Sequence, residues 1–155
     1  MKEIRCYSFE SELYANINLV FECLSKDKHV LKWNSQIIEN IFDGNENDLG
    51  EGSTFITRQK IGKKVYELEG IYTKYETPYY VNVETKTKEG LSKTEYILRE
   101  TPEGTHFIVN VYLVPSNWTY KIITKMLKWS FKFIYDDQFN SFIEYVYQME
   151  YERNE

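Results

Sequence analysis

The chain of 155 residues has few cysteines and histidines, and this scarcity excludes several kinds of site. Its two cysteines, Cys6 and Cys23, form no Cys-x-x-Cys pair, so we expect free thiols and a cytoplasmic protein. Its two histidines, His29 and His106, lie in unrelated segments and form no His-Glu-x-x-His motif. The Gly-x-Ser-x-Gly motif of many hydrolases is also missing. The sequence therefore predicts neither a bound metal nor a cofactor.

Long apolar runs and excess positive charge are missing as well. No stretch approaches the ~18 consecutive apolar residues of a membrane span. Residues 1–6 lack the apolar run of a signal peptide. Acidic residues number 24 against 19 basic ones, giving a net charge of −5. Because nucleic-acid binding depends on clustered positive charge, we expect no nucleic-acid partner, and we expect no stable membrane insertion.

Glycine and proline are absent from the last third of the chain, between Trp118 and about Tyr151. Most residues in the first half of this segment are large and apolar, which predicts a long helix covered on most of its circumference. Four lysines recur at spacings of four, three and four, as on one solvated face of an α-helix. We favour the interpretation that this lysine face is simply exposed to water, and contact with an anionic membrane is the alternative. The members of this face are Lys121, Lys125, Lys128 and Lys132.

The predicted helix is too long to cross the protein in a straight line. About 34 residues at ~1.5 Å each span roughly 50 Å, whereas a domain of this size is roughly 40 Å across. The polar face also shifts along the helix, from the lysines to Glu144 and Gln148. We therefore expect a bend or break near residues 135–138.

The residues before this helix alternate repeatedly between apolar and charged side chains. Each expected strand has one apolar and one charged face, as in an antiparallel sheet covered on one side. The sequence predicts one α+β domain over residues 1–155, in which a curved antiparallel sheet of about seven strands wraps around the C-terminal helix. Two short helices follow the first strand. We expect strands at 3–13, 37–42, 55–60, 64–75, 79–87, 93–100 and 105–114.

Aromatic residues make up 17% of the chain, with fourteen tyrosines, and tyrosine suits pocket walls that are apolar with a polar tip. A sheet curled around an aromatic helix commonly leaves a cavity for an apolar small molecule. Asp137 would hold a polar end of such a ligand if the helix stays regular, and would face water if the helix bends first. We expect the cavity to be lined by Trp33, Phe55, Thr57, Tyr66, Leu68, Tyr72, Val83, Tyr96, Phe107, Val109, Met126, Ser130, Phe133, Ile134 and Asp137.

Four short motifs sharpen this prediction. Residues 15–21 have the small-residue and Val-aromatic entry into a first helix, and Trp33-Asn34 closes the helical pair. Gly50-Glu51-Gly52-Ser53 opens a strand, and Glu76-Thr77-Pro78 follows another. In this order they resemble the START-like superfamily (SRPBCC), the group of birch-pollen-allergen and polyketide cyclase/dehydrase proteins. The resemblance implies a helix-grip fold with a deep cavity for lipids, sterols, polyketides or hormones.

The resemblance leaves three functions open. The favoured one is binding or transport of a hydrophobic small molecule such as a lipid or polyketide. The second is an enzyme of the polyketide cyclase/dehydrase type without a metal, using cavity tyrosines or Asp137 as acid–base groups. The third is a protein-interaction module with a collapsed cavity. No catalytic residue carries over from the superfamily, because it shares no catalytic motif that matches this chain.

Overall fold

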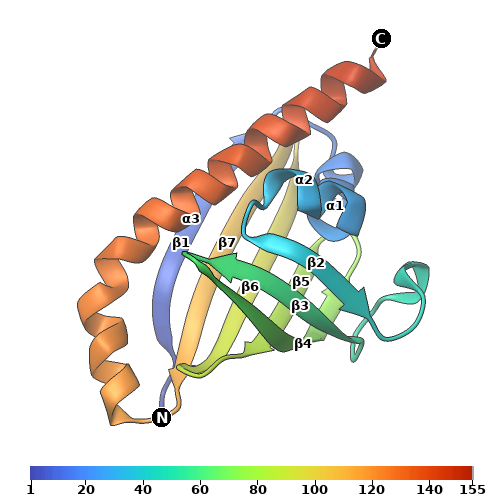
Figure 1. Ribbon diagram of the computed structural model, residues 1–155. Coiled ribbons are helices and arrows are strands. Elements are labelled where there is room, and N and C mark those ends of the chain that lie inside the picture. Colours follow the sequence, from blue (N-terminus) through green and yellow to red (C-terminus); the bar gives the residue numbers. More distant parts are fainter. Residues whose placement is uncertain (155) are drawn as a thin grey trace.

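A curved antiparallel sheet of seven strands forms the body of the protein, and a long C-terminal helix runs along it (Figure 1). The computed structural model describes residues 1–154. The predicted α+β class and the order of the elements are confirmed. The elements are β1 (Ile4–Leu13), α1 (Ile17–Ser25), α2 (Asp27–Trp33), β2 (Ile37–Phe42), the 3-10 turn η1 (Glu46–Asp48), β3 (Thr54–Ile61), β4 (Lys64–Glu76), β5 (Tyr80–Lys86), β6 (Gly90–Thr101), β7 (Gly104–Pro115) and α3 (Trp118–Arg153).

The strands lie in the order β1-β7-β6-β5-β4-β3-β2, and all neighbours are antiparallel. Consecutive strands from β2 to β7 are therefore neighbours, and β1 pairs with β7 at the far edge. The register places Val83 of β5 opposite Thr94 of β6, and Tyr96 opposite Val109 of β7. These residues share the concave face, because side chains on paired strands point the same way at opposed positions.

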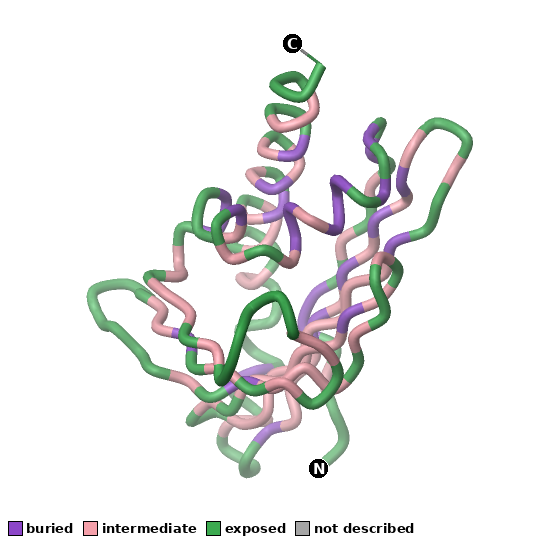
Figure 2. Tube along the Cα trace, turned by 90° about the vertical axis from the view of Figure 1, so that its right-hand side faces the viewer, coloured by how far each residue is buried: buried purple, intermediate pink, exposed green. Residues whose placement is uncertain are grey.

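The main core lies where the second half of α3 meets β1, β7 and the two short helices. Phe139, Phe142 and Val146 of α3 are almost completely buried. The ring centroid of Phe142 lies 4.9 Å from that of Trp33 and 5.0 Å from that of Phe107. This cluster holds α2, α3 and β7 together. Figure 2 shows buried segments on the long helix, on the short helices beside it and along the strands.

The first half of α3 extends past this core, and its large apolar side chains are exposed. The prediction that the sheet covers this part of the helix is wrong. A helix of 36 residues is about 54 Å long at ~1.5 Å per residue, and its buried residues after Thr124 all lie in the second half. Of the four lysines predicted to be exposed, Lys125, Lys128 and Lys132 are exposed, whereas Lys121 is half-buried.

The predicted break near residues 135–138 does not occur, because α3 is one continuous helix. Figure 1 shows instead that the helix changes direction among its first turns, drawn in lighter orange. Asn117 caps the helix by accepting a hydrogen bond from the Tyr120 backbone N–H at 3.0 Å. The helix therefore curves around the edge of the sheet without losing its hydrogen bonding.

His106 lies on the convex face of the sheet, as its alternation with the buried Phe107 predicts. Its imidazole contacts the carboxylates of Glu12 and Glu10, with the Nε2 atom 2.5 Å from Glu10 Oε1. The hydrogen bond to Glu12, helped by that to Glu10, raises the pKa of His106. His29, the other histidine, is buried between α2 and α3, and burial lowers its pKa although Glu22 lies 3.6 Å away.

We therefore expect the two imidazoles to titrate on opposite sides of the ordinary pKa of ~6.5 in an NMR pH titration. His29→Gln removes one signal and assigns the other. For His106 the charged form is favoured in the folded state, so its stabilisation is complete below ~6.5 and is lost as pH rises through the raised pKa. Two imidazoles that both titrate below the ordinary value would contradict the contacts with Glu10 and Glu12.

Candidate functional site

A cavity of about 310 Å³ lies between the concave face of the sheet, α2 and the middle of α3. Strands β2 to β6 supply its floor, and Tyr135, Gln138 and Phe139 of α3 close it on the other side. Its volume lies at the low end of the roughly 300–1,000 Å³ range of small-molecule sites. Besides aromatic and aliphatic side chains, the wall carries hydroxyl and amide groups: Ser25, Asn34, Gln36, Asn40, Thr57, Gln59, Thr85, Thr87, Ser92, Thr94 and Gln138.

An aromatic cluster shapes one end of the cavity. The ring of Phe55 lies 5.2 Å from that of Tyr72 and 6.0 Å from that of Phe42, measured between centroids. Phe55 packs directly over Gly70, its partner on β4, and a Cβ atom at Gly70 would lie only 2.3 Å from the ring. Glycine at this position therefore provides the space in which the Phe55 ring lies.

Three tyrosine hydroxyls in the cavity wall have no hydrogen-bond partner among the described residues: those of Tyr72, Tyr96 and Tyr135. Tyr96 is half-buried and lines the cavity. Burial raises the pKa of Tyr72 and Tyr96, and it raises the pKa of Tyr135 to about 12. All three hydroxyls are therefore protonated at neutral pH and able to donate to a ligand or to water.

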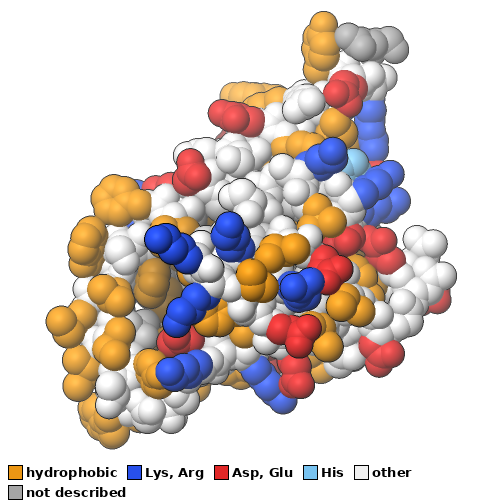
Figure 3. All heavy atoms as spheres, viewed as in Figure 1, with side chains coloured by type: hydrophobic (Ala, Val, Ile, Leu, Met, Phe, Trp, Pro, Cys, Tyr) orange, Lys and Arg blue, Asp and Glu red, His pale blue; other side chains and the backbone are white. Residues whose placement is uncertain are grey.

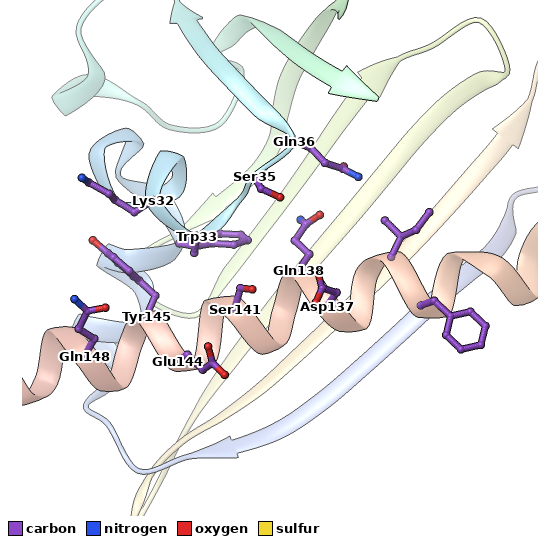
Figure 4. Close-up of a pocket in the computed structure, with 12 residues that line it drawn as sticks. Lys32, Trp33, Ser35, Gln36, Asp137, Gln138, Ser141, Glu144, Tyr145 and Gln148 are labelled. Atoms are coloured by element: carbon purple, nitrogen blue, oxygen red, sulfur yellow. The ribbon is translucent and has the colours of Figure 1, made fainter. Parts of the chain in front are cut away.

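A second, more open space lies outside the cavity, between the end of α2 and α3 (Figure 4). We call it the outer groove; its volume is about 740 Å³. Trp33, Gln36 and Gln138 line both the outer groove and the cavity. The side chains of Gln36 and Gln138 point toward one another in Figure 4. The two spaces therefore meet at these three residues, which form an entrance to the cavity.

The structure brings together about half of the residues predicted to line the cavity. The strand residues among them lie there because alternation along β3 to β6 correctly separates the concave from the convex face. Trp33 lies there because it ends α2 directly above the sheet. The cavity wall contains Trp33, Phe55, Thr57, Leu68, Tyr72, Val83 and Tyr96.

The other predicted residues lie elsewhere. Phe107 and Val109 point to the concave side, but β7 lies under the second half of α3, so they are wholly buried in the core rather than in the cavity wall. Tyr66 is 41% exposed on β4, near the end of the β3–β4 hairpin.

The five predicted residues from α3 belong to its outer or flanking surface. Met126 is 67% exposed, and the hydroxyl of Ser130 donates to the Leu127 carbonyl at 2.6 Å. Phe133, Ile134 and Asp137 line the outer groove and not the cavity. Their helix face was chosen opposite the lysines, whereas the face that meets the cavity carries Tyr135, Gln138 and Phe139.

Sequence reasoning missed these three α3 residues and several hydroxyl side chains of the strands. The strand signal was present, because Thr85 and Thr94 lie on the same alternating face as Val83 and Tyr96. Tyr135, Phe139 and Phe142 follow helical spacings of four and three, but the choice between this face and the one bearing Met126 depends on where the helix meets the sheet.

The described residues hold no group of three His, Cys, Asp or Glu side chains that is suited to a metal ion. Within residues 1–154, no helix is both long and apolar enough to cross a membrane. Asp27 is the one charged residue among the described residues that line the cavity, and its Oδ1 accepts a hydrogen bond from Asn40 Nδ2 at 2.8 Å.

A seven-strand antiparallel sheet, two short helices after the first strand and a long terminal helix packed on the sheet define a helix-grip protein of the START-like (SRPBCC) superfamily. The sequence matches the family described as "Activator of Hsp90 ATPase homolog 1-like protein" over residues 14–143, and the chain belongs to this family. The predicted superfamily resemblance is therefore confirmed. A comparison with curated protein sequences finds no match.

Several solved structures share the fold. A protein of unknown function, SA2116 from Staphylococcus aureus, is 18% identical with a TM-score of 0.74, and the match covers 96% of each chain. Ara h 8.0201 is 13% identical with a TM-score of 0.69, covering 95% of this chain and 99% of the other. An AHSA1-like protein from Aeromonas hydrophila is 17% identical with a TM-score of 0.64, covering 96% and 94%. At these identities the likeness shows the fold alone.

Proposed function

We propose that the protein binds an uncharged, mainly apolar small molecule in the cavity, as a carrier or receptor rather than as an enzyme. The observation that supports this most directly is an aromatic wall combined with three hydroxyls that have no hydrogen-bond partner within residues 1–154, those of Tyr72, Tyr96 and Tyr135. The aromatic rings offer apolar contact area, and the hydroxyls offer donors that fix the orientation of a ligand. Trp33, Gln36 and Gln138 provide the entrance from the outer groove.

The composition of the wall favours an uncharged ligand. Apart from Asp27, which is hydrogen-bonded to Asn40, the wall residues that the structure describes carry no charge. A charged ligand group would lose its hydration in this cavity without gaining a partner of opposite sign. Carbonyl and hydroxyl oxygens, by contrast, can accept hydrogen bonds from the tyrosines.

The same wall argues against acid–base catalysis. General acids and bases work best when their pKa lies near the working pH. Among the described residues, the wall contains no histidine and no cysteine, and its one carboxylate, that of Asp27, accepts a hydrogen bond from Asn40. Burial moves the pKa of Tyr72, Tyr96 and Tyr135 further above neutrality. These tyrosines suit binding by donated hydrogen bonds better than proton abstraction.

The test is a fluorescence titration with N-phenyl-1-naphthylamine, an uncharged probe that becomes fluorescent in apolar surroundings. Val83→Phe adds a ring inside the cavity and is expected to weaken probe binding about tenfold or more, since the volume is already near the lower limit of ~300 Å³ for ligand sites. Asn82→Phe adds the same ring on the opposite face of β5 and should leave the affinity unchanged.

Circular dichroism and thermal unfolding establish that both variants are folded. Equal probe affinity of Val83→Phe and the original protein would exclude the cavity as the binding site. A protein that binds no uncharged apolar probe at all would instead favour the interaction module. Native mass spectrometry of freshly purified protein would identify a ligand retained from the cell.

A further inference from the structure

The first half of α3 carries a row of large apolar side chains that no other element covers. Figure 3 shows hydrophobic side chains gathered over this part of the helix. We call this row the apolar face of α3. Each member is between 54% and 69% exposed, and the row consists of Trp118, Ile122, Met126, Trp129 and Phe133.

The apolar face is continuous and has a lysine row directly beside it. At ~100° per residue, its five members fall within an arc of roughly 80°. Beyond its far side, Ile123, Leu127 and Ile134 are also exposed. On the near side the four lysines fall within roughly 60° of one another, next to Trp118. These four lysines are Lys121, Lys125, Lys128 and Lys132.

This segment differs in charge from the rest of the chain. Residues 118–134 contain four lysines and no acidic residue, whereas the whole chain has a net charge of −5. Lys121 Nζ lies 4.2 Å from the centroid of the Trp118 ring, so a positive charge lies directly beside an exposed indole. Lys132 pairs with Asp136 at 3.2 Å, just after the segment.

We propose that the apolar face of α3 docks the protein on an anionic lipid membrane. A helix that lies in the membrane interface buries its apolar side among the acyl chains, while the lysines beside that side contact anionic headgroups. Tryptophan favours this interface because its ring is apolar and its N–H is polar. The helix lies on the surface and does not cross the bilayer, in keeping with the absence of a spanning helix in residues 1–154.

Charge favours a lipid surface over a second copy of the chain. Two copies joined through this face would bring two rows of four lysines close together, without acidic residues in 118–134 to offset them. An anionic membrane supplies the opposite charge and adapts to a convex ridge of side chains.

Docking in this orientation brings the cavity entrance near the lipid. Phe133 ends the apolar face and also lines the outer groove, which meets the cavity at Trp33, Gln36 and Gln138. A hydrophobic molecule could then pass between the membrane and the cavity. The docking itself is argued from α3 alone and does not depend on the proposed cavity ligand.

The test is co-sedimentation of the full chain with phosphatidylcholine vesicles, with and without phosphatidylglycerol. We expect binding to the anionic vesicles only, weakened by high salt. Trp118 and Trp129 should shift their emission to shorter wavelength on binding, while Trp33 is already buried. The double variant Lys121→Gln/Lys125→Gln should weaken binding about 25-fold, at roughly fivefold for each lysine.

The apolar contribution is tested with Trp129→Ala/Phe133→Ala, which should weaken binding about tenfold or more. The matched controls are Tyr151→Ala, an aromatic residue equally exposed at the other end of α3, and Lys86→Gln on β5; both should bind like the original protein. No binding to anionic vesicles, or binding unaffected by the α3 variants, would overturn the proposal. A concentration-dependent dimer that Trp129→Ala/Phe133→Ala abolishes, without vesicle binding, would assign the face to a second copy.

The two proposals fail independently. Trp129→Ala/Phe133→Ala leaves the cavity wall intact and should keep the affinity for N-phenyl-1-naphthylamine. Val83→Phe leaves α3 intact and should keep vesicle binding. Loss of only one activity in each variant separates the cavity from the docking face.

Discussion

Replacement of Phe142 by alanine is expected to lower the free energy of unfolding by about 3–5 kcal/mol, the range for removing a large aromatic side chain from a core. Phe142 has no exposed surface, and its ring packs against Trp33 at 4.9 Å and Phe107 at 5.0 Å. The substitution removes the contact that joins α2 to α3 and β7, and leaves a space that these rigid elements cannot fill. Urea unfolding followed by circular dichroism measures the loss.

Phe133→Ala is the matched control, because it makes the same chemical change on the same helix. Phe133 is 68% exposed, and we expect its replacement to change the free energy of unfolding by no more than about 0.5 kcal/mol. Similar losses in the two variants would mean that the first half of α3 is covered in solution. The pair therefore tests both the core and the exposure on which the membrane proposal depends.

The sheet could be predicted from the sequence because each strand carries its own signal. Val81, Val83 and Thr85 alternate with charged or amide residues, and glycine or proline marks the turns at Gly62, Gly90 and Gly104. Such signals are local, so they can be read from the sequence without knowing which strands are paired. The strand residues of the cavity wall follow from the same alternation, once the concave face is known.

The position of α3 could not be predicted in the same way. Its sequence offers two apolar faces, one with Trp129 and Phe133 and one with Tyr135, Phe139 and Phe142. Which face is buried depends on where the helix meets β1 and β7. The helical periodicity of the sequence carries no information about that position. Met126 and Phe133 were predicted to line the cavity because every large apolar residue was assumed to be covered. Both side chains are in fact exposed.

A second large effect is expected at the turn between β6 and β7. Gly104→Ala should lower the free energy of unfolding by about 3 kcal/mol, since the residue has a φ of +157° and a Cβ atom there would lie 2.2 Å from the Leu13 carbonyl oxygen. That neighbour is backbone and cannot move aside like a flexible side chain. Thr105 Oγ1 also donates a hydrogen bond to the Ala15 carbonyl at 2.8 Å, so the turn is fixed to the β1–α1 junction.

The consequence reaches the cavity, because the β1–α1 junction leads into the two helices that supply Leu24, Val30 and Trp33 to its wall. We therefore expect the folded fraction of Gly104→Ala to bind N-phenyl-1-naphthylamine more weakly as well as to unfold in less urea. Gly50→Ala is the control: its added Cβ would meet no atom within 4 Å, and we expect a change of no more than about 0.5 kcal/mol. If Gly104→Ala proved as stable as Gly50→Ala, the close approach of the β6–β7 turn to Leu13 and Ala15 would be refuted. The argument that this turn helps to hold the two short helices above the cavity would then be refuted as well.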